Sequence, residues 1–315
     1  MMLNSTMKKT FRAALAIVCA GTLMAGTAAC GSTSSSGGDK VALLVSTLNN
    51  PFFVDLRDGA QAAAKDLGVD LMVSDAQNDS STQQNQAQNA QSQGAKAVII
   101  NPVDSDAASP AVAPLLSSNL PVISVDRSVT GEDVTSHIAS DNVAGGAQAA
   151  DELAKAVGEK GKVIILQGTP GAASTRDRGD GFKKEIKKYS GIEVVAEQTA
   201  NFDRAEALDV TTNLMQSNPD VVGIYAENDE MALGAIQSLG SKAGADVKIF
   251  GFDGTEDGLK AVSNGTMVGT IAQQPKELGK KAVEAAVKAI KGESVEKTES
   301  IEVKTVTKGN VADFQ

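Results

Sequence analysis

Short apolar runs alternate with segments of helical periodicity from residue 40 almost to the end of the chain. The first run, at 41–46, is typical of a strand buried on both faces of a parallel sheet. Similar runs predict strands at 69–74, 97–101, 121–125, 162–166, 192–198, 221–226, 248–252 and 267–272, and helical spacing predicts helices between them, among them 142–158, 178–189, 204–216, 231–239 and 279–291. This rhythm of alternating strands and helices predicts an α/β fold with parallel sheets, and 315 residues suggest about two domains.

The junction between the first strand and the first helix carries an unusual pair of aromatic residues. Asn50 stands where a helix N-cap belongs, and Pro51 fits the first helical position. Phe52 and Phe53 follow directly, although only 3% of the chain is aromatic. Because ligands of open α/β sheets bind at the carboxyl ends of strands, these rings are candidates for a binding site. A purely structural role, with both rings in the core and Asn50 only a cap, remains equally open from these residues.

Polar side chains that can donate and accept hydrogen bonds follow several other predicted strands. Each one alone is an ordinary turn or capping residue. Together they place amides, carboxylates and guanidiniums at the same end of the strands, as would suit a ligand with many hydroxyl groups and an apolar ring face. The candidates are Asn101, Asp126, Arg127, Arg176, Arg178, Asn228 and Asp253.

Composition disfavours nucleic acid and catalysis. The net charge is −10, and binding to nucleic acid needs basic patches. The single histidine, His137, has no cysteine or histidine cluster around it at metal-ligand spacing, and no nucleophile elbow or phosphate-binding loop is present. Asp126 and Asp253 could form an acid–base pair, but the arginines are expected to hold both ionised. We therefore expect a non-enzyme without cofactor or metal.

The N-terminus has the pattern of a targeting segment. A basic stretch precedes a short apolar stretch and then small residues that lead to Cys30, so 1–29 is interpreted as a signal peptide. Cys30 and the Gly/Ser-rich residues after it resemble a bacterial lipoprotein signal, which predicts a lipidated flexible tether at 30–39. We expect export and anchoring on the extracytoplasmic face of the cell membrane.

Several short motifs closely resemble those of the ribose-binding members of the type I periplasmic-binding-protein family of bacterial sugar ABC transporters. They are STLNNPFF (46–53), INP (100–102), DR (126–127), SHIASDN (136–142), NDEMALGA (228–235), GFDGT (251–255) and TIAQ (270–273). The resemblance implies two doubly wound parallel-sheet lobes joined by a three-segment hinge. It places one lobe at 40–140 and 274–302 and the other at 141–273 and 303–315.

The same resemblance implies a sugar site in the cleft between the lobes. Its residues would be Asn50, Phe52, Phe53, Asn101, Asp126, Arg127, Ser140, Arg178, Phe202, Asn228, Asp253 and Gln273; Ser140, Phe202 and Gln273 come from the resemblance alone. Partners would be D-ribose or a similar monosaccharide and an ABC permease with its ATPase, and the protein would be a monomer. Another monosaccharide, a furanose-like signal molecule, a LacI-like regulator core and a sugar-processing enzyme are the alternatives; a LacI-type protein would need a basic helix-turn-helix before the first strand.

Overall fold

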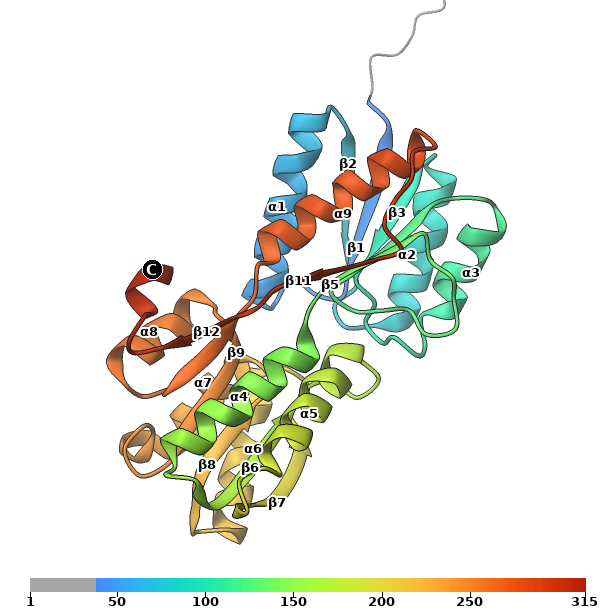
Figure 1. The fold of residues 1–315 in the computed structure, drawn as a ribbon. Coiled ribbons are helices and arrows are strands. Elements are labelled where there is room, and N and C mark those ends of the chain that lie inside the picture. Colours follow the sequence, from blue (N-terminus) through green and yellow to red (C-terminus); the bar gives the residue numbers. More distant parts are fainter. Residues whose placement is uncertain (1–37) are drawn as a thin grey trace, which may run out of the picture. The chain divides into compact units, whose positions relative to one another are not determined.

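The computed structural model describes residues 38–315 of the chain. These residues form two α/β lobes, each built on a six-stranded sheet, which confirms the predicted fold class (Figure 1). The expected signal peptide, and all but the last two residues of the expected tether, lie outside the described residues.

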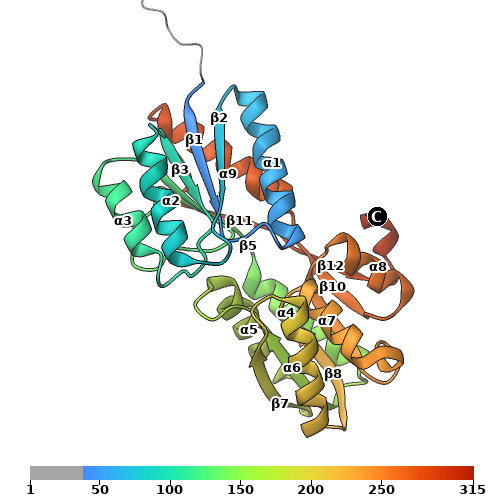
Figure 2. The same cartoon turned by 180° about the vertical axis from the view of Figure 1, so that it is seen from behind.

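The first sheet has the strand order β11-β5-β4-β3-β1-β2, and all its paired strands are parallel. Helices α1 and α9 pack on one face, and α2 and α3 on the other (Figure 2). The strands are β1 (Lys40–Val45), β2 (Asp70–Asp75), β3 (Ala97–Ile100), β4 (Val122–Val125), β5 (Ser136–Ser140) and β11 (Thr298–Ile301). The helices are α1 (Pro51–Leu67), α2 (Ser80–Ser92), α3 (Ser109–Ser117) and α9 (Pro275–Ile290).

The second sheet has the order β12-β10-β9-β8-β6-β7, and only the edge strand β12 is antiparallel. The strands are β6 (Lys160–Gln167), β7 (Gly191–Thr199), β8 (Val221–Ala226), β9 (Lys248–Asp253), β10 (Gly269–Ala272) and β12 (Lys304–Thr307). The helices are α4 (Asn142–Ala156), α5 (Ala173–Ile186), α6 (Arg204–Ser217), α7 (Asp229–Leu239) and α8 (Glu256–Asn264), with short 3-10 helices η1 (Gly240–Lys242) and η2 (Val311–Phe314).

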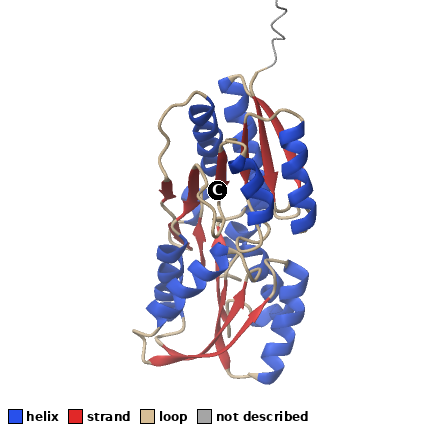
Figure 3. Cartoon of the chain, turned by 90° about the vertical axis from the view of Figure 1, so that its right-hand side faces the viewer, coloured by secondary structure: helices blue, strands red, loops and turns tan. Residues whose placement is uncertain are grey.

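The chain passes between the two sheets three times. The crossings lie between β5 and α4 at Asp141, between β10 and α9 at 273–274, and between β11 and β12 at 302–303. Figure 3 shows loops gathered between the two lobes, where strands of both sheets end. Side chains on these loops can therefore meet although they come from distant parts of the sequence.

Each lobe has an apolar core on both faces of its sheet. In β1, Val41, Leu43 and Val45 pack with α1 and α9, whereas Ala42 and Leu44 pack with α2 and α3. In β6, alternate residues divide in the same way between two clusters. Because successive side chains of a strand point to opposite faces, only a continuous apolar run can fill both cores. The runs seen in the sequence have this physical cause.

Helices α4 and α5 cross at very short distance through two glycines. A Cβ atom on Gly146 would lie 2.1 Å from the carbonyl oxygen of Arg178, and one on Gly181 would lie 2.1 Å from that of Val143. Such distances exclude any side chain, so the two helices touch backbone to backbone. This close packing brings Asn142, at the start of α4, next to the side chain of Arg178.

Several elements differ from the pattern in the sequence. The strands β5, β11 and β12 and the helices α3 and α8 are not among those predicted, and α5 begins at Ala173 rather than at Arg178. The outer strands β11 and β12 are rich in polar residues, because an edge strand is partly exposed and gains its stability from backbone pairing. Helix α5 opens with small and polar residues after Ala172, which offers no capping side chain.

Candidate functional site: a cavity between the lobes

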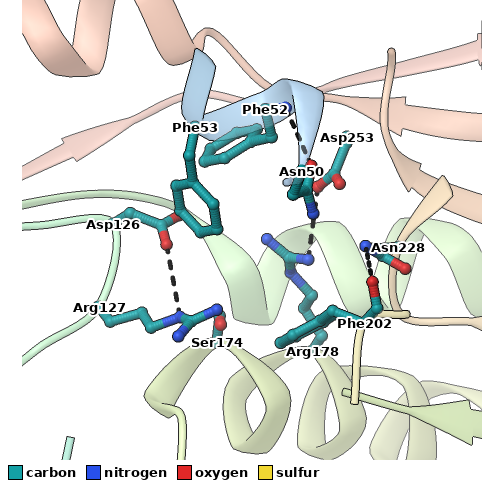
Figure 4. Close-up of a pocket in the computed structure, with 10 residues that line it drawn as sticks. All are labelled: Asn50, Phe52, Phe53, Asp126, Arg127, Ser174, Arg178, Phe202, Asn228 and Asp253. Carbon is teal, nitrogen blue, oxygen red and sulfur yellow. Dashed lines mark hydrogen bonds and ion pairs between the residues drawn. The ribbon is translucent and has the colours of Figure 1, made fainter. Parts of the chain in front are cut away.

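A cavity lies between the two lobes at the ends of the strands (Figure 4). It contains about 230 Å³ of space not occupied by protein atoms. Its lining residues are Asn50, Phe52, Phe53, Asp126, Arg127, Ser174, Arg178, Phe202, Asn228 and Asp253.

The N-terminus of α1 forms an apolar wall of the cavity. Asn50 caps the helix by accepting a hydrogen bond from the backbone N–H of Phe52 at 2.9 Å. The rings of Phe52 and Phe53 meet edge to face, with 5.2 Å between their centres. Both rings are also part of the core of the first lobe. The two rings therefore lie both in the core and at the cavity, and their role in binding stays a prediction.

Phe202 supplies an aromatic face from the second lobe. Its ring packs on Gly168, where a Cβ atom would come within 2.0 Å of the ring. Asn228 caps α7 by accepting from Met231 and donates a hydrogen bond of 3.4 Å to the carbonyl of Phe202. Phe202 has φ of 59°, a left-handed conformation unusual for a large side chain. The surrounding contacts hold that conformation and keep the ring at the cavity.

Asp126 and Arg127 form the polar wall of the first lobe. The Oδ2 atom of Asp126 lies 3.7 Å from Nε of Arg127, and both side chains are buried. Nη1 of Arg127 donates to the carbonyls of Pro102 and Val103 at 3.1 and 3.0 Å. The guanidinium carbon lies 5.4 Å from the centre of the Phe53 ring and 5.5 Å from that of Phe202. Arg127 thus contacts aromatic rings of both lobes.

Arg178 and Asp253 form the polar wall of the second lobe. Nε of Arg178 donates to Oδ1 of Asn142 at 2.8 Å, and Nη1 donates to the Glu227 carbonyl at 2.7 Å and to Asp253 Oδ1 at 3.5 Å. The guanidinium also stacks on Phe252, 3.8 Å from the ring centre. These contacts fix the orientation of the donor fork.

Gln273 connects this second wall to a crossing between the lobes. Its Nε2 donates to Oδ1 of Asp253 at 2.7 Å. Asp253 itself has φ of 121°, an uncommon conformation that places local strain at the end of β9. The strain is consistent with a site that requires the carboxylate in one position.

Burial dominates the electrostatics of both acid–arginine pairs. Desolvation raises the pKa of Asp126 above its ordinary value, against the lowering effect of Arg127 and Arg178. It also raises the pKa of Asp253 well above its ordinary value, against Arg178. We expected the arginines to hold both carboxyls ionised; at these buried positions loss of hydration opposes that effect and sets the direction of both pKa shifts.

Glu227 lies behind Arg178 and is fully buried. Its Oε2 accepts a hydrogen bond of 2.7 Å from the backbone N–H of Gly168. Burial raises its pKa to about 8, so the carboxyl is largely protonated near neutral pH. Because a protonated Glu227 carries no charge, it does not compete with Asp253 or with a ligand for the guanidinium of Arg178.

Nine of the twelve predicted residues line the cavity, and the other three lie beside it. The amide of Asn101 is occupied by Ser46, Val125 and Asp126, with 3.1 Å from its Nδ2 to Asp126 Oδ2. Ser140 lines a separate cavity together with Asp126 and His137. Gln273 lines an adjoining cavity next to Asp253. Roles in ligand binding for all twelve stay predictions.

Ser174 is the lining residue that sequence reasoning missed. It lies in the first turn of α5 and is buried. The predicted helix began at Arg178, so Ser174 fell into a loop with no feature to distinguish it. The small residues at 171–174 were the only signal for a close approach of this segment to the cleft.

No cluster of histidine, cysteine or acidic side chains within residues 38–315 could hold a metal ion. No helix in this part of the chain is long and apolar enough to cross a membrane.

The chain matches the family model of the periplasmic binding protein domain over residues 41–294. It therefore belongs to the periplasmic binding proteins, which are solute-binding components of ABC transporters and not enzymes. Within this family it is 47% identical to the ribose import binding protein RbsB of Escherichia coli over 88% of this chain and 93% of the relative.

Two further relatives extend the comparison. The ribose import binding protein RbsB of Bacillus subtilis is 43% identical over 87% of this chain and 90% of the relative. A solved ABC transporter solute-binding protein from Bacillus halodurans, with bound myo-inositol, is 33% identical with a TM-score of 0.84, covering 90% of this chain and 99% of that one.

Proposed function

We propose that the protein is an extracytoplasmic solute-binding lipoprotein that captures D-ribose between its lobes and delivers it to an ABC permease driven by an ATPase. One observation carries the choice of ligand class. Among the residues that line the cavity, Asp126 Oδ1 and Arg127 Nε are buried and have no hydrogen-bond partner within the described part of the chain. Because an unpaired buried polar group costs about 1–3 kcal/mol, these atoms favour a ligand that both donates and accepts.

A pentose fits this chemistry. Each sugar hydroxyl can donate to a carboxylate and accept from a guanidinium, and the faces of the phenylalanine rings can cover the apolar C–H surface of the sugar. We assign sugar binding to the twelve predicted residues. Asn101 would act indirectly, through its hydrogen bond to the carboxylate of Asp126. The similarity to the two ribose import binding proteins supports D-ribose as the particular sugar.

Capture would proceed by closure about the three crossings. Residues of both lobes line the cavity, so a sugar contacts all of them only when the lobes are together. A ligand that binds the closed form better shifts the population toward it. The closed form is then the species we expect a permease to recognise.

Isothermal titration of the purified protein with D-ribose, followed by xylose, arabinose, galactose and glucose, tests this proposal. We expect tight one-to-one binding of ribose and weak or no heat from the others, because a site with buried polar partners rejects ligands that leave them unpaired. Binding of another sugar with no response to ribose would contradict the choice of ribose. Turnover of the bound sugar would contradict a binding function.

A different monosaccharide, a furanose-like molecule or a related polyol is the second candidate. The hydroxyl of Ser174 adds a further donor and acceptor to the cavity wall beside Arg127 (Figure 4). The related structure with bound myo-inositol supports a polyol as an alternative. The same titration series, extended to myo-inositol, separates the two candidates.

We expect Cys30→Ser to release the protein from the cell membrane, because the substitution removes the thiol that a lipid would modify. The measurement is the distribution of the protein between membrane and soluble fractions of the producing cell. Cys19→Ser is the matched control and should stay with the membrane. Equal distribution of wild type and Cys30→Ser would contradict lipidation at this position.

A single sedimenting species of monomer mass is expected for the released protein.

A further inference from the structure

Helix α5 begins without a capping side chain from its own lobe. Ala172 occupies the N-cap position, where a side-chain oxygen would normally accept from the first turn. The backbone N–H of Ala173 instead donates to the hydroxyl of Ser105, a residue of the other lobe, at 3.1 Å. Ser105 is completely buried. One lobe therefore completes the helix terminus of the other.

Two more contacts join the same segments. The backbone N–H of Ser105 donates to the carbonyl of Gly171 at 3.1 Å. At the surface, Nη1 of Arg176 lies 3.2 Å from Oδ2 of Asp106. We call these five residues, Ser105, Asp106, Gly171, Ala173 and Arg176, the interlobe latch. The buried bonds should contribute most, since exposed ion pairs contribute about 0–1 kcal/mol.

The interlobe latch is connected to the cavity on both sides. In the first lobe, Arg127 holds the carbonyls of Pro102 and Val103, which directly precede the latch loop. In the second lobe, the first turn of α5, whose Ala173 N–H donates to Ser105, also contains Ser174. Arg178 follows one turn later, and both Ser174 and Arg178 line the cavity. Ser105 does not line the cavity itself. The hydrogen bond made by Ser105 can thus affect sugar binding only by holding the two lobes in their closed arrangement.

We propose that Ser105 is a positioning residue that sets sugar affinity by capping α5 across the closed cleft. This inference rests on the proposed function, because it concerns the closed, sugar-bound form. The hydrogen bonds of the interlobe latch connect two lobes, so they stabilise the closed form and are absent when the lobes separate. Their loss should speed sugar release while leaving the sugar-free protein unchanged.

The test compares Ser105→Ala with Ser136→Ala in the full chain. Ser136 is a matched control because it is also buried and its hydroxyl donates to the Glu296 carbonyl at 2.7 Å, within one lobe. For Ser105→Ala we expect the Kd for D-ribose to rise about threefold to tenfold, the effect of one lost buried hydrogen bond. Radiolabelled ribose chased with unlabelled sugar should dissociate faster by the same factor, with an unchanged melting temperature of the sugar-free protein.

The control should behave in the opposite way. Ser136→Ala should lower the melting temperature of the sugar-free protein and leave the Kd unchanged. An unchanged Kd for Ser105→Ala, a failure of that variant to fold, or a fall in its sugar-free melting temperature equal to that of Ser136→Ala would each overturn the proposal. If the wild-type protein binds no sugar at all, the proposed function fails as well. If the wild type and Ser105→Ala bind ribose with the same Kd, only the role of Ser105 is removed.

Discussion

Arg178→Ala is expected to weaken D-ribose binding by about 2–4 kcal/mol, which is roughly 30-fold to 1,000-fold in Kd. The guanidinium donates to Asn142, to the Glu227 carbonyl and to Asp253, and it stacks on Phe252. Its removal leaves Asp253 buried without its cationic partner and takes a donor fork away from the cavity. Asp253→Ala should give a loss in the same range, because it strands Arg178. Titration calorimetry measures both.

Arg57→Ala is the matched control for this experiment. Arg57 pairs with its neighbour Asp58 on the outside of α1 and does not line the cavity. Surface substitutions of this kind usually change free energies by less than about 0.5 kcal/mol. Arg178→Lys should recover only part of the affinity, since an ammonium group cannot reproduce the fixed fork that reaches three acceptors. A loss below about 0.5 kcal/mol for Arg178→Ala would exclude this residue from the site.

The second large effect concerns stability and pH. Burial raises the pKa of Glu227 from 4.5 to about 8. Between these values the folded protein keeps a proton that the unfolded chain has released, so the free energy of unfolding falls as pH rises from about 4.5 to about 8. The shift corresponds to a loss on the order of 3–5 kcal/mol. Glu227→Gln removes the ionisation and keeps an acceptor for the Gly168 N–H, so it should remove this loss.

Urea unfolding of the sugar-free protein at pH 5 and pH 9 measures the effect. The two proteins should have similar stability at pH 5, and Glu227→Gln should be the more stable by a few kcal/mol at pH 9. Comparing variant with wild type cancels the pH dependence of Asp126 and Asp253, whose pKa values are also raised. Glu284→Gln, a substitution on the surface of α9, is the control. A difference between wild type and Glu227→Gln that does not change with pH would contradict a buried, protonated Glu227.

Much of this arrangement can be predicted from the chain because its causes are local. The apolar run at the start of β1 must fill two cores, and Asn50 and Pro51 fix the start of α1 through the requirements of a helix terminus. Asp126, Arg127, Asn228 and Asp253 follow strands, and parallel strands of one sheet end at one edge. Phe202 and Gln273, in contrast, were predicted from family resemblance only.

The sequence by itself determined the α/β class, the strands with apolar runs and the polar residues at their ends, because periodicity and turn chemistry act over a few residues. Only the tertiary structure decided which side chains enter the cavity. Asn101 turns to Asp126 and Ser140 to another cavity, while Ser174 enters because α5 begins early. At that start the backbone N–H of Ala173 donates to the hydroxyl of Ser105, 68 residues away in the chain. The pKa of Glu227 likewise follows from burial, a property that distant segments create together.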